Sequence, residues 1–219
     1  GLLLVAKTKM AHVDLTRQFV DRRIKKTYTA VVNGIPNEPR GSQISTEEAF
    51  DLGFDMSAID NEESDYSDEM RTDVGLWQII DEPVAEKSAV TIFRTLRYSS
   101  CLKANENILT LLELKPKTGR YHQLRRHLAW FRDCPIVGDS TYDGGDKSKG
   151  LRGKGLFLCS NKLTLEHPYY NSDEGRKEWD NVVGAGIEGV KNIHFESSSA
   201  RLKIWKDIDT GKIMVQASI

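Results

Sequence analysis

Apolar and polar positions over the first 34 residues predict a strand, a helix and a second strand in turn. Leu2–Ala6 is an apolar run of strand length, which predicts a buried strand. Thr8 is a favoured N-cap residue and apolar side chains follow it at helical spacing, which predicts a helix over Lys9–Arg23. Thr27–Asn33 alternates and is rich in β-branched residues, which predicts a strand ending at Gly34.

Strand character returns several times later in the chain. The predicted strands are Leu76–Ile80, Ala89–Arg97, Asn107–Leu114, Leu156–Cys159 and Leu163–Leu165. The run WKDIDTGKIMVQ (205–216) predicts a closing hairpin.

Three segments lack such a pattern. Residues 36–73 hold scattered Pro, Gly, Ser and acidic residues, which indicates a long, partly disordered insertion. Residues 144–155, GGDKSKGLRGKG, indicate a flexible basic loop. Residues 171–200 are rich in Gly, Asn and Glu. We expect the core to fold without residues 45–73.

The charge of the chain is segregated. The whole chain has a formal net charge of −1, but residues 45–73 hold eleven acidic residues and one basic residue, a net charge of −10. The other residues therefore carry 30 basic and 21 acidic side chains, a net charge of +9. A basic chain that carries one acidic segment is compatible with an RNA-binding surface, whereas the total charge alone argues against such a surface.

The most informative stretch is KPKTGRYHQLRRHLA (115–129), which has five basic residues, two histidines and no acidic residue. Thr118 and Gly119 predict a turn that feeds a helix. The apolar stripe of this helix is predicted to hold Tyr121, Leu124, Leu128 and Phe131. At about 100° per residue, Arg126 points away from the stripe into water.

Arg125 lies at the border of the same stripe, roughly 80° from its centre. A half-buried guanidinium needs a carboxylate or phosphate partner, because an unpaired buried charge is costly. The stretch therefore predicts an anion-binding site on a helix.

Four blocks of this sequence occur in the order typical of one enzyme family. They are GLLLVAKTK (1–9), KKTYTAVVNG (25–34), TGRYHQLRRH (118–127) and PIVGDSTYDG (135–144). Together they resemble the RluA-type pseudouridine synthases, although each block alone is weak. The resemblance implies an α+β fold, with a mixed, mainly antiparallel β-sheet and flanking helices. It also implies one catalytic domain over 1–219, with 36–73 as an acidic insertion and 171–219 as an extension atypical of the family.

The family places its catalytic aspartate in H-R-L-D-x-x-T-S-G, and this chain starts at the last glycine of that motif. The aspartate would lie five residues before Gly1. We therefore expect a fragment that lacks the N-terminal part of the domain and is inactive alone, while its parent is an isomerase.

The resemblance implies a reaction on uridine within ribosomal or transfer RNA. The N1–C1′ bond breaks and a C5–C1′ bond forms, with no metal, redox cofactor or nucleotide required. The target base must leave its stack to be reached. Arg125 matches the arginine that pairs with the catalytic aspartate; the alternative is an arginine that is salt-bridged inside the fold. Tyr28 matches the tyrosine that stacks on the base and is implicated in removing the C5 proton; the alternative is a core aromatic residue on a strand.

Other residues of the motif stretch are candidates for RNA contact. Arg120, His122 and Gln123 precede or open the predicted helix, where phosphate binds favourably, and Lys117 adds charge. His122 and His127 are five residues apart, so they do not share one helical face as a metal-binding pair does. Gly138 and Asp139 are predicted to set a turn.

Composition limits the remaining classes. A chain of 219 residues can bury a sizeable core, and its longest apolar run is far shorter than the roughly 20 residues that span a bilayer. Cys101, Cys134 and Cys159 show no metal-binding spacing and predict reduced thiols in an intracellular, reducing compartment. We expect a monomer whose partner is RNA, not a membrane or a metal.

Two alternatives remain open. The first is an RNA-binding module of the same fold without catalysis, which the residue at the position of the family's aspartate would distinguish. The second is a metal hydrolase, which the histidine spacing opposes.

Overall fold

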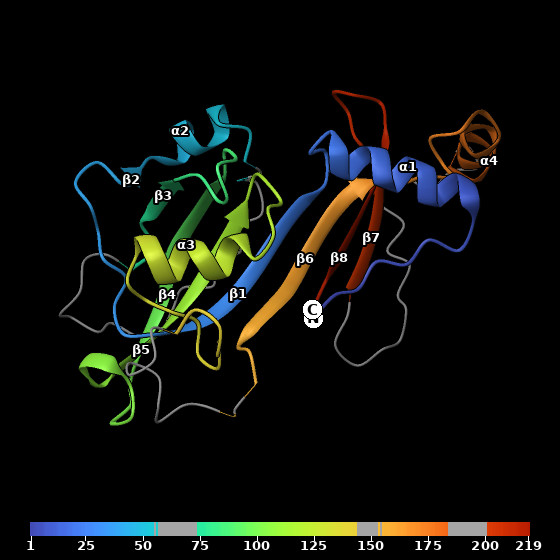
Figure 1. Cartoon of the computed structure of the whole chain (residues 1–219). Helices are drawn as coiled ribbons and strands as arrows, with labels where there is room; N and C mark the ends of the chain where they lie inside the picture. Colours follow the sequence, from blue (N-terminus) through green and yellow to red (C-terminus); the bar gives the residue numbers. More distant parts are fainter. Residues whose placement is uncertain (55, 57–73, 144–152, 154, 184–200) are drawn as a thin grey trace. The chain divides into compact units, whose positions relative to one another are not determined.

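The computed structural model of the chain describes residues 1–54, 56, 74–143, 153, 155–183 and 201–219 (Figure 1). These residues fall into two compact units. The first consists of Gly1–Lys26 and Ser160–Ile219, and the second of Thr27–Cys159. The single catalytic domain over 1–219 stays a prediction.

An antiparallel sheet forms the second unit. Its strands, in spatial order, are β2 (Gln43–Ile44), β3 (Trp77–Asp81), β4 (Val90–Ser100), β5 (Ile108–Pro116) and β1 (Lys25–Asn33). The strands predicted between Thr27 and Leu114 are confirmed to within a few residues. Those predicted at Leu156–Cys159 and Leu163–Leu165 are parts of one strand, Leu158–Glu166. β4 and β5 are joined by the short 3-10 helix η1 (Asn105–Asn107), and β4 carries a bulge between Thr95 and Arg97.

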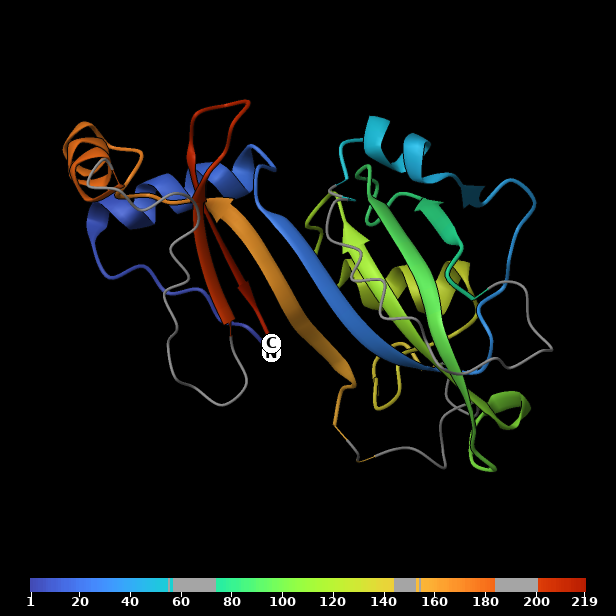
Figure 2. The ribbon, with the colours of Figure 1, turned by 180° about the vertical axis from the view of Figure 1, so that it is seen from behind.

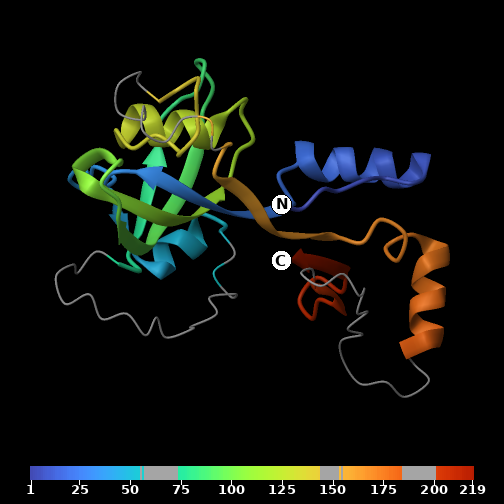
Figure 3. The same cartoon turned by 90° about the horizontal axis from the view of Figure 1, so that it is seen from below.

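Two helices cover opposite faces of this sheet: α3 (Gln123–Phe131) and α2 (Thr46–Asp51). Figure 3 shows them on either side of the strands, and Figure 2 shows the strands from the side away from α3. Successive residues of β4 point to the two faces, as a pleated strand requires. Phe93 packs in the core with α3, and Ile92 packs in the core with α2.

The α2 core contains part of the predicted insertion. Ser45 and Glu48 form a capping box that starts α2, because each side chain accepts a hydrogen bond from the other residue's backbone N–H. Phe54 and Met56 are buried with Trp77. This burial argues against the expectation that the core folds without residues 45–73, which stays a prediction. The sequence analysis missed β2 and α2. Residues 55 and 57–73 lie outside the described residues, and the insertion itself stays a prediction.

The first unit packs α1 (Lys9–Val20) and α4 (Asp173–Val183) with three antiparallel strands. In spatial order the strands are β6 (Leu158–Glu166), β8 (Ile213–Ser218) and β7 (Arg201–Lys206). Thr8 caps α1 as predicted, since its hydroxyl accepts the N–H of Ala11. β7 and β8 confirm the predicted closing hairpin.

The predicted strand over Leu2–Ala6 does not form. The segment is irregular, although the N–H of Leu2 donates to the carbonyl of Ser160. Leu2 and Ala6 pack beside the buried cluster around Leu15, but Leu3 is 87% exposed. An apolar run indicates burial of some side chains, and it does not by itself supply a neighbouring strand.

Together these elements confirm the predicted fold class, an α+β fold of antiparallel strands and flanking helices. Two other expectations concern parts of the chain that the structure describes only partly. Residues 144–152 and 154 of the basic loop lie outside the described residues. The C-terminal region, predicted as an extension, supplies α4, β7 and β8.

Candidate functional site

The candidate site is built around the first turn of α3, in the second unit. The helix begins after His122, whose backbone has left-handed dihedral angles with φ of 54°. Leu124 and Leu128 are buried and anchor the helix to the core. Tyr121 precedes the helix and is 72% exposed, so its predicted place in the apolar stripe is wrong. The helix starts two residues later than that stripe requires.

Gln123 fixes the loop that leads into α3. Its side-chain oxygen accepts from the Thr118 hydroxyl at 2.6 Å and from the Arg120 N–H at 3.0 Å. Its side-chain nitrogen donates to Thr91 Oγ1 at 2.9 Å and to the carbonyl of Val90 at 3.1 Å. These bonds give the Gln123 side chain a structural role. Its predicted contact with RNA stays a prediction, and these bonds do not support it. Thr118 belongs to this network and is not the N-cap.

An ion pair between Arg125 and Asp139 is the centre of the site. Arg125 Nε donates to Asp139 Oδ2, and Nη2 donates to Oδ1, both at 2.7 Å. The Arg125 side chain is 15% exposed, and the Asp139 side chain is fully buried. The half-buried guanidinium therefore has the carboxylate partner that the sequence analysis required, and the pairing is bidentate.

Asp139 both pairs with Arg125 and holds the turn that follows it. Its Oδ1 also accepts the backbone N–H groups of Thr141 and Tyr142, so it sets the predicted turn. Burial by itself would raise the pKa of Asp139, but the hydrogen bonds from Arg125 and the two N–H groups outweigh it and lower the pKa. The same hydrogen bond raises the pKa of Arg125. Both groups are therefore charged at neutral pH.

His122 and Tyr142 border this ion pair. Arg125 Nη1 lies 3.0 Å from His122 Nε2, and His122 Nδ1 lies 3.1 Å from the Tyr142 hydroxyl. Arg125 Nη1 also lies 3.3 Å from His122 Nδ1, so the guanidinium faces both nitrogens of the ring. Desolvation, followed by the charges of Arg125 and Arg126, lowers the pKa of His122. His122 is therefore neutral at pH 7.

Arg126 does not point into open water as predicted. Its Nε donates to the Tyr142 hydroxyl at 3.0 Å, and its guanidinium lies over three aromatic rings. Tyr142 thus joins the two neighbouring arginines. The sequence analysis missed this role, although Tyr142 belongs to the GDSTY run that it quoted.

The other predicted site residues take different positions. Tyr28 is half-buried on β1, opposite Leu114 of β5, and packs against the core that holds α3. Lys117 is exposed in the loop before α3. Arg120 Nε donates to the carbonyl of Ser88 at 3.0 Å, which holds its side chain along the loop. The catalytic and RNA-binding roles of these residues stay predictions.

His127 is a buried structural residue. Its Nε2 lies 3.1 Å from the carbonyl of Glu82, to which it donates, and burial lowers its pKa to about 4. Among the described residues, no group of three or more histidines, cysteines or acids could hold a metal ion. Cys134 is buried, whereas Cys101 and Cys159 are half-buried, and all three are reduced thiols.

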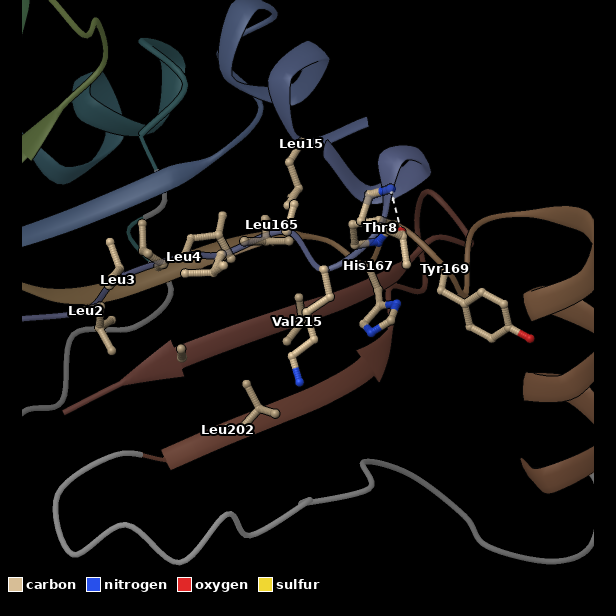
Figure 4. Close-up of a pocket in the computed structure, with 17 residues that line it drawn as sticks. Leu2, Leu3, Leu4, Thr8, Leu15, Leu165, His167, Tyr169, Leu202 and Val215 are labelled. Carbon is tan, nitrogen blue, oxygen red and sulfur yellow. Dashed lines mark hydrogen bonds between the residues drawn. The ribbon is translucent and has the colours of Figure 1, made fainter. Parts of the chain in front are cut away.

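A mostly apolar cavity lies in the first unit. Its volume is about 420 Å³. Leu2, Leu3 and Leu4 of the N-terminal segment line it together with Leu165, Leu202 and Val215 (Figure 4). His167 also lines it, but its Nδ1 accepts the backbone N–H of Tyr170. This cavity offers little acid–base chemistry, so the Arg125–Asp139 cluster is the better candidate site. No helix within the described ranges is long and apolar enough to cross a membrane.

The chain is similar to known proteins of one kind. The family model for RNA pseudouridylate synthase matches residues 1–130. The tRNA pseudouridine synthase C of Vibrio cholerae is 30% identical over 198 residues, which cover 87% of this chain and 69% of that protein. The ribosomal large subunit pseudouridine synthase C of Rickettsia conorii is 32% identical over 174 residues, 79% of this chain and 47% of that protein.

A solved structure, the human RNA pseudouridylate synthase domain containing 1, is 22% identical with a TM-score of 0.47. The match covers 78% of this chain and 59% of that chain. The chain thus spans about half to two thirds of the length of several relatives.

Proposed function

Because the chain belongs to the RNA pseudouridylate synthase family, we propose that it forms the arginine-bearing part of an RNA pseudouridine synthase. The reaction converts uridine to pseudouridine within ribosomal or transfer RNA. Both classes of RNA are named for relatives, and the basic residues outside 45–73 favour a polyanionic partner.

The geometry of Arg125 carries this proposal. An arginine has five N–H donors, and Asp139 takes the edge formed by Nε and Nη2. Nη1 contacts His122. Among the described contacts, Nη2 keeps one further N–H, which points along the end of the guanidinium because the other binds Asp139, and Nη1 has two N–H groups for its contact with His122 and a further acceptor. That end can accept a second carboxylate while Asp139 holds the first edge.

In the proposed enzyme, the second carboxylate is the family's catalytic aspartate. Arg125 keeps it ionised, since a nearby cation lowers the pKa of a carboxylate. Asp139 fixes the guanidinium so that its free end is presented in one orientation. Tyr28 stacks on the base and helps to remove the C5 proton. Lysine cannot replace Arg125, because an ammonium group lacks the planar fork that binds two carboxylates.

The test uses this chain preceded by a segment that carries R-L-D-x-x-T-S before Gly1. With RNA labelled with tritium at C5 of uridine, it should release tritium, and the chain without that segment should not. Arg125→Lys and Tyr28→Phe should lose turnover while RNA binding is largely kept. The matched control is replacement of the motif's aspartate by asparagine.

Two results would contradict the proposal. Turnover by the chain without the aspartate segment would show that the nucleophile lies elsewhere. RNA binding without turnover in the extended chain would instead favour a non-catalytic RNA-binding module.

A further inference from the structure

Tyr121, just before α3, and Trp130, on α3, are two large exposed aromatic rings with a guanidinium between them. Tyr121 is 72% exposed and Trp130 is 56% exposed. The Arg126 guanidinium carbon lies 5.5 Å from the Tyr121 ring centroid and 5.4 Å from that of Trp130. We call Tyr121, Arg126, Trp130 and Tyr142 the aromatic surface.

This arrangement is held in place by contacts within the protein. Arg126 Nε donates to the Tyr142 hydroxyl at 3.0 Å, and Trp130 meets the Tyr142 ring edge-on at a centroid distance of 5.5 Å. Tyr121 stacks on His122, with centroids 3.8 Å apart and planes inclined by 22°. The rings are therefore ordered before any partner arrives, which reduces the entropy lost on binding.

The aromatic surface has no role in the core. Leu124 and Leu128 supply the buried side of α3, so the fold does not require large apolar rings at positions 121 and 130. Exposed aromatic rings next to arginine are characteristic of recognition surfaces.

The charge of the surface is positive. Asp139 balances Arg125, and His122 is neutral at pH 7 for the reasons given above. Arg126 has no acidic partner among the residues that the structure describes, so it adds a positive charge between the rings. Lys117 and Arg120, on the loop before α3, carry further positive charge.

We propose that the aromatic surface binds unpaired nucleotides of single-stranded RNA, with bases stacked on Tyr121 and Trp130 and a phosphate on Arg126. The choice of RNA rests on the proposed function. Stacking suits unpaired bases, because a duplex keeps the faces of its bases covered. An acidic peptide would satisfy Arg126 but would leave the ring faces unused. The surface would thus hold the strand that flanks the target uridine.

The experiment compares two labelled RNA oligonucleotides of equal length, one with bases and one abasic, by fluorescence anisotropy with the full chain. Tyr121→Ala and Trp130→Ala should each weaken binding of the RNA with bases by about 5- to 150-fold, the effect typical of losing one stacked base. Binding of the abasic RNA should stay unchanged. Phe50→Ala is the control, since Phe50 is 69% exposed on α2 of the same unit.

Arg126→Gln should weaken both RNAs and reduce the slope of log affinity against log salt by about one. The proposal is overturned if the alanine variants bind the RNA with bases as tightly as the unchanged chain. The proposal is also overturned if Tyr121→Ala and Trp130→Ala lose the same affinity for both RNAs. Binding of a poly-glutamate peptide that depends on the two rings to the same extent would overturn it as well.

Failure of this proposal can be told apart from failure of the proposed function. Loss of aromatic dependence with intact turnover in the extended chain rejects only the aromatic surface. If the unchanged chain binds neither oligonucleotide, the aromatic surface is rejected, and turnover by the extended chain decides the proposed function separately.

Discussion

Asp139 binds Arg125 through two hydrogen bonds of 2.7 Å and also accepts two backbone N–H groups of its own turn. One buried carboxylate thus links the catalytic candidate on α3 to the loop that follows the helix. The sequence analysis assigned Asp139 only the turn. Its second role makes it a positioning residue for Arg125.

Asp139→Asn should lower the free energy of unfolding by about 3–5 kcal/mol, because it leaves a largely buried guanidinium without its counter-charge. Urea denaturation measures the change. The control is Asp180→Asn, whose 4.0 Å contact with Lys206 joins two side chains that are at least half exposed; it should change stability by less than about 1 kcal/mol. Equal stability of the two variants would mean that solvent replaces Asp139.

Phe54→Ala should cost about 3–5 kcal/mol, because Phe54 is buried in the core beneath α2. Phe50→Ala removes the same side chain from an exposed position four residues away and should change stability by about 0.5 kcal/mol or less. Midpoints of urea unfolding give the comparison. A small loss for Phe54→Ala would restore the expectation that this segment is dispensable for the fold.

His127 should make the fold less stable in mild acid. Burial lowers its folded-state pKa to about 4, whereas an unfolded histidine titrates near ~6.5. The unfolded chain therefore binds more protons as the pH falls from about 6.5 to about 4, and stability falls across that window by up to about 3 kcal/mol.

The measurement is the difference in unfolding free energy between the unchanged chain and His127→Gln, taken at several pH values. Glutamine lacks a titrating group, so the difference should depend on pH between 4 and 6.5. Because both chains share the remaining titrating groups, their contribution cancels. A constant difference would show that His127 titrates alike in both states.

Gly138→Ala should be destabilising by about 2–6 kcal/mol, from backbone strain and a steric clash together. Gly138 has φ of 79°, and a Cβ there would lie 1.6 Å from the carbonyl oxygen of Gly155. Gly41 has φ of 78° with nothing within 4 Å of its Cβ position, so Gly41→Ala isolates the strain. Equal melting temperatures of the two variants would refute the clash.

Local patterns predicted the elements whose signals lie within them. The cap at Thr8, the helix after it and the strands β1, β3, β4 and β5 were predicted to within a few residues, because capping chemistry and alternation are local properties. The strand predicted over Leu2–Ala6 was wrong, because a strand requires a neighbouring strand and an apolar run does not specify one. α2 was missed because its six residues are too few for a helical period to be recognised.

The candidate site was predictable in part for the same reason. Helical geometry placed Arg125 at the border of the core, and the cost of burying charge required an anion. The sequence pattern could not identify Asp139 as that anion. Asp139 lies 14 residues after Arg125, and such a separation does not determine which acidic side chain turns inward. The aromatic surface was hidden because the start of α3 shifts Tyr121 out of the helix.

The four hydrogen bonds of Gln123 have a consequence for how the loop before α3 meets a polyanion. The side-chain amide of Gln123 ties that loop to β4. The positions from which Lys117 and Arg120 extend are therefore limited before a nucleic acid strand approaches. Under the proposed function, selectivity for strand geometry would then depend on this scaffold, whereas the attraction itself would come from the charges.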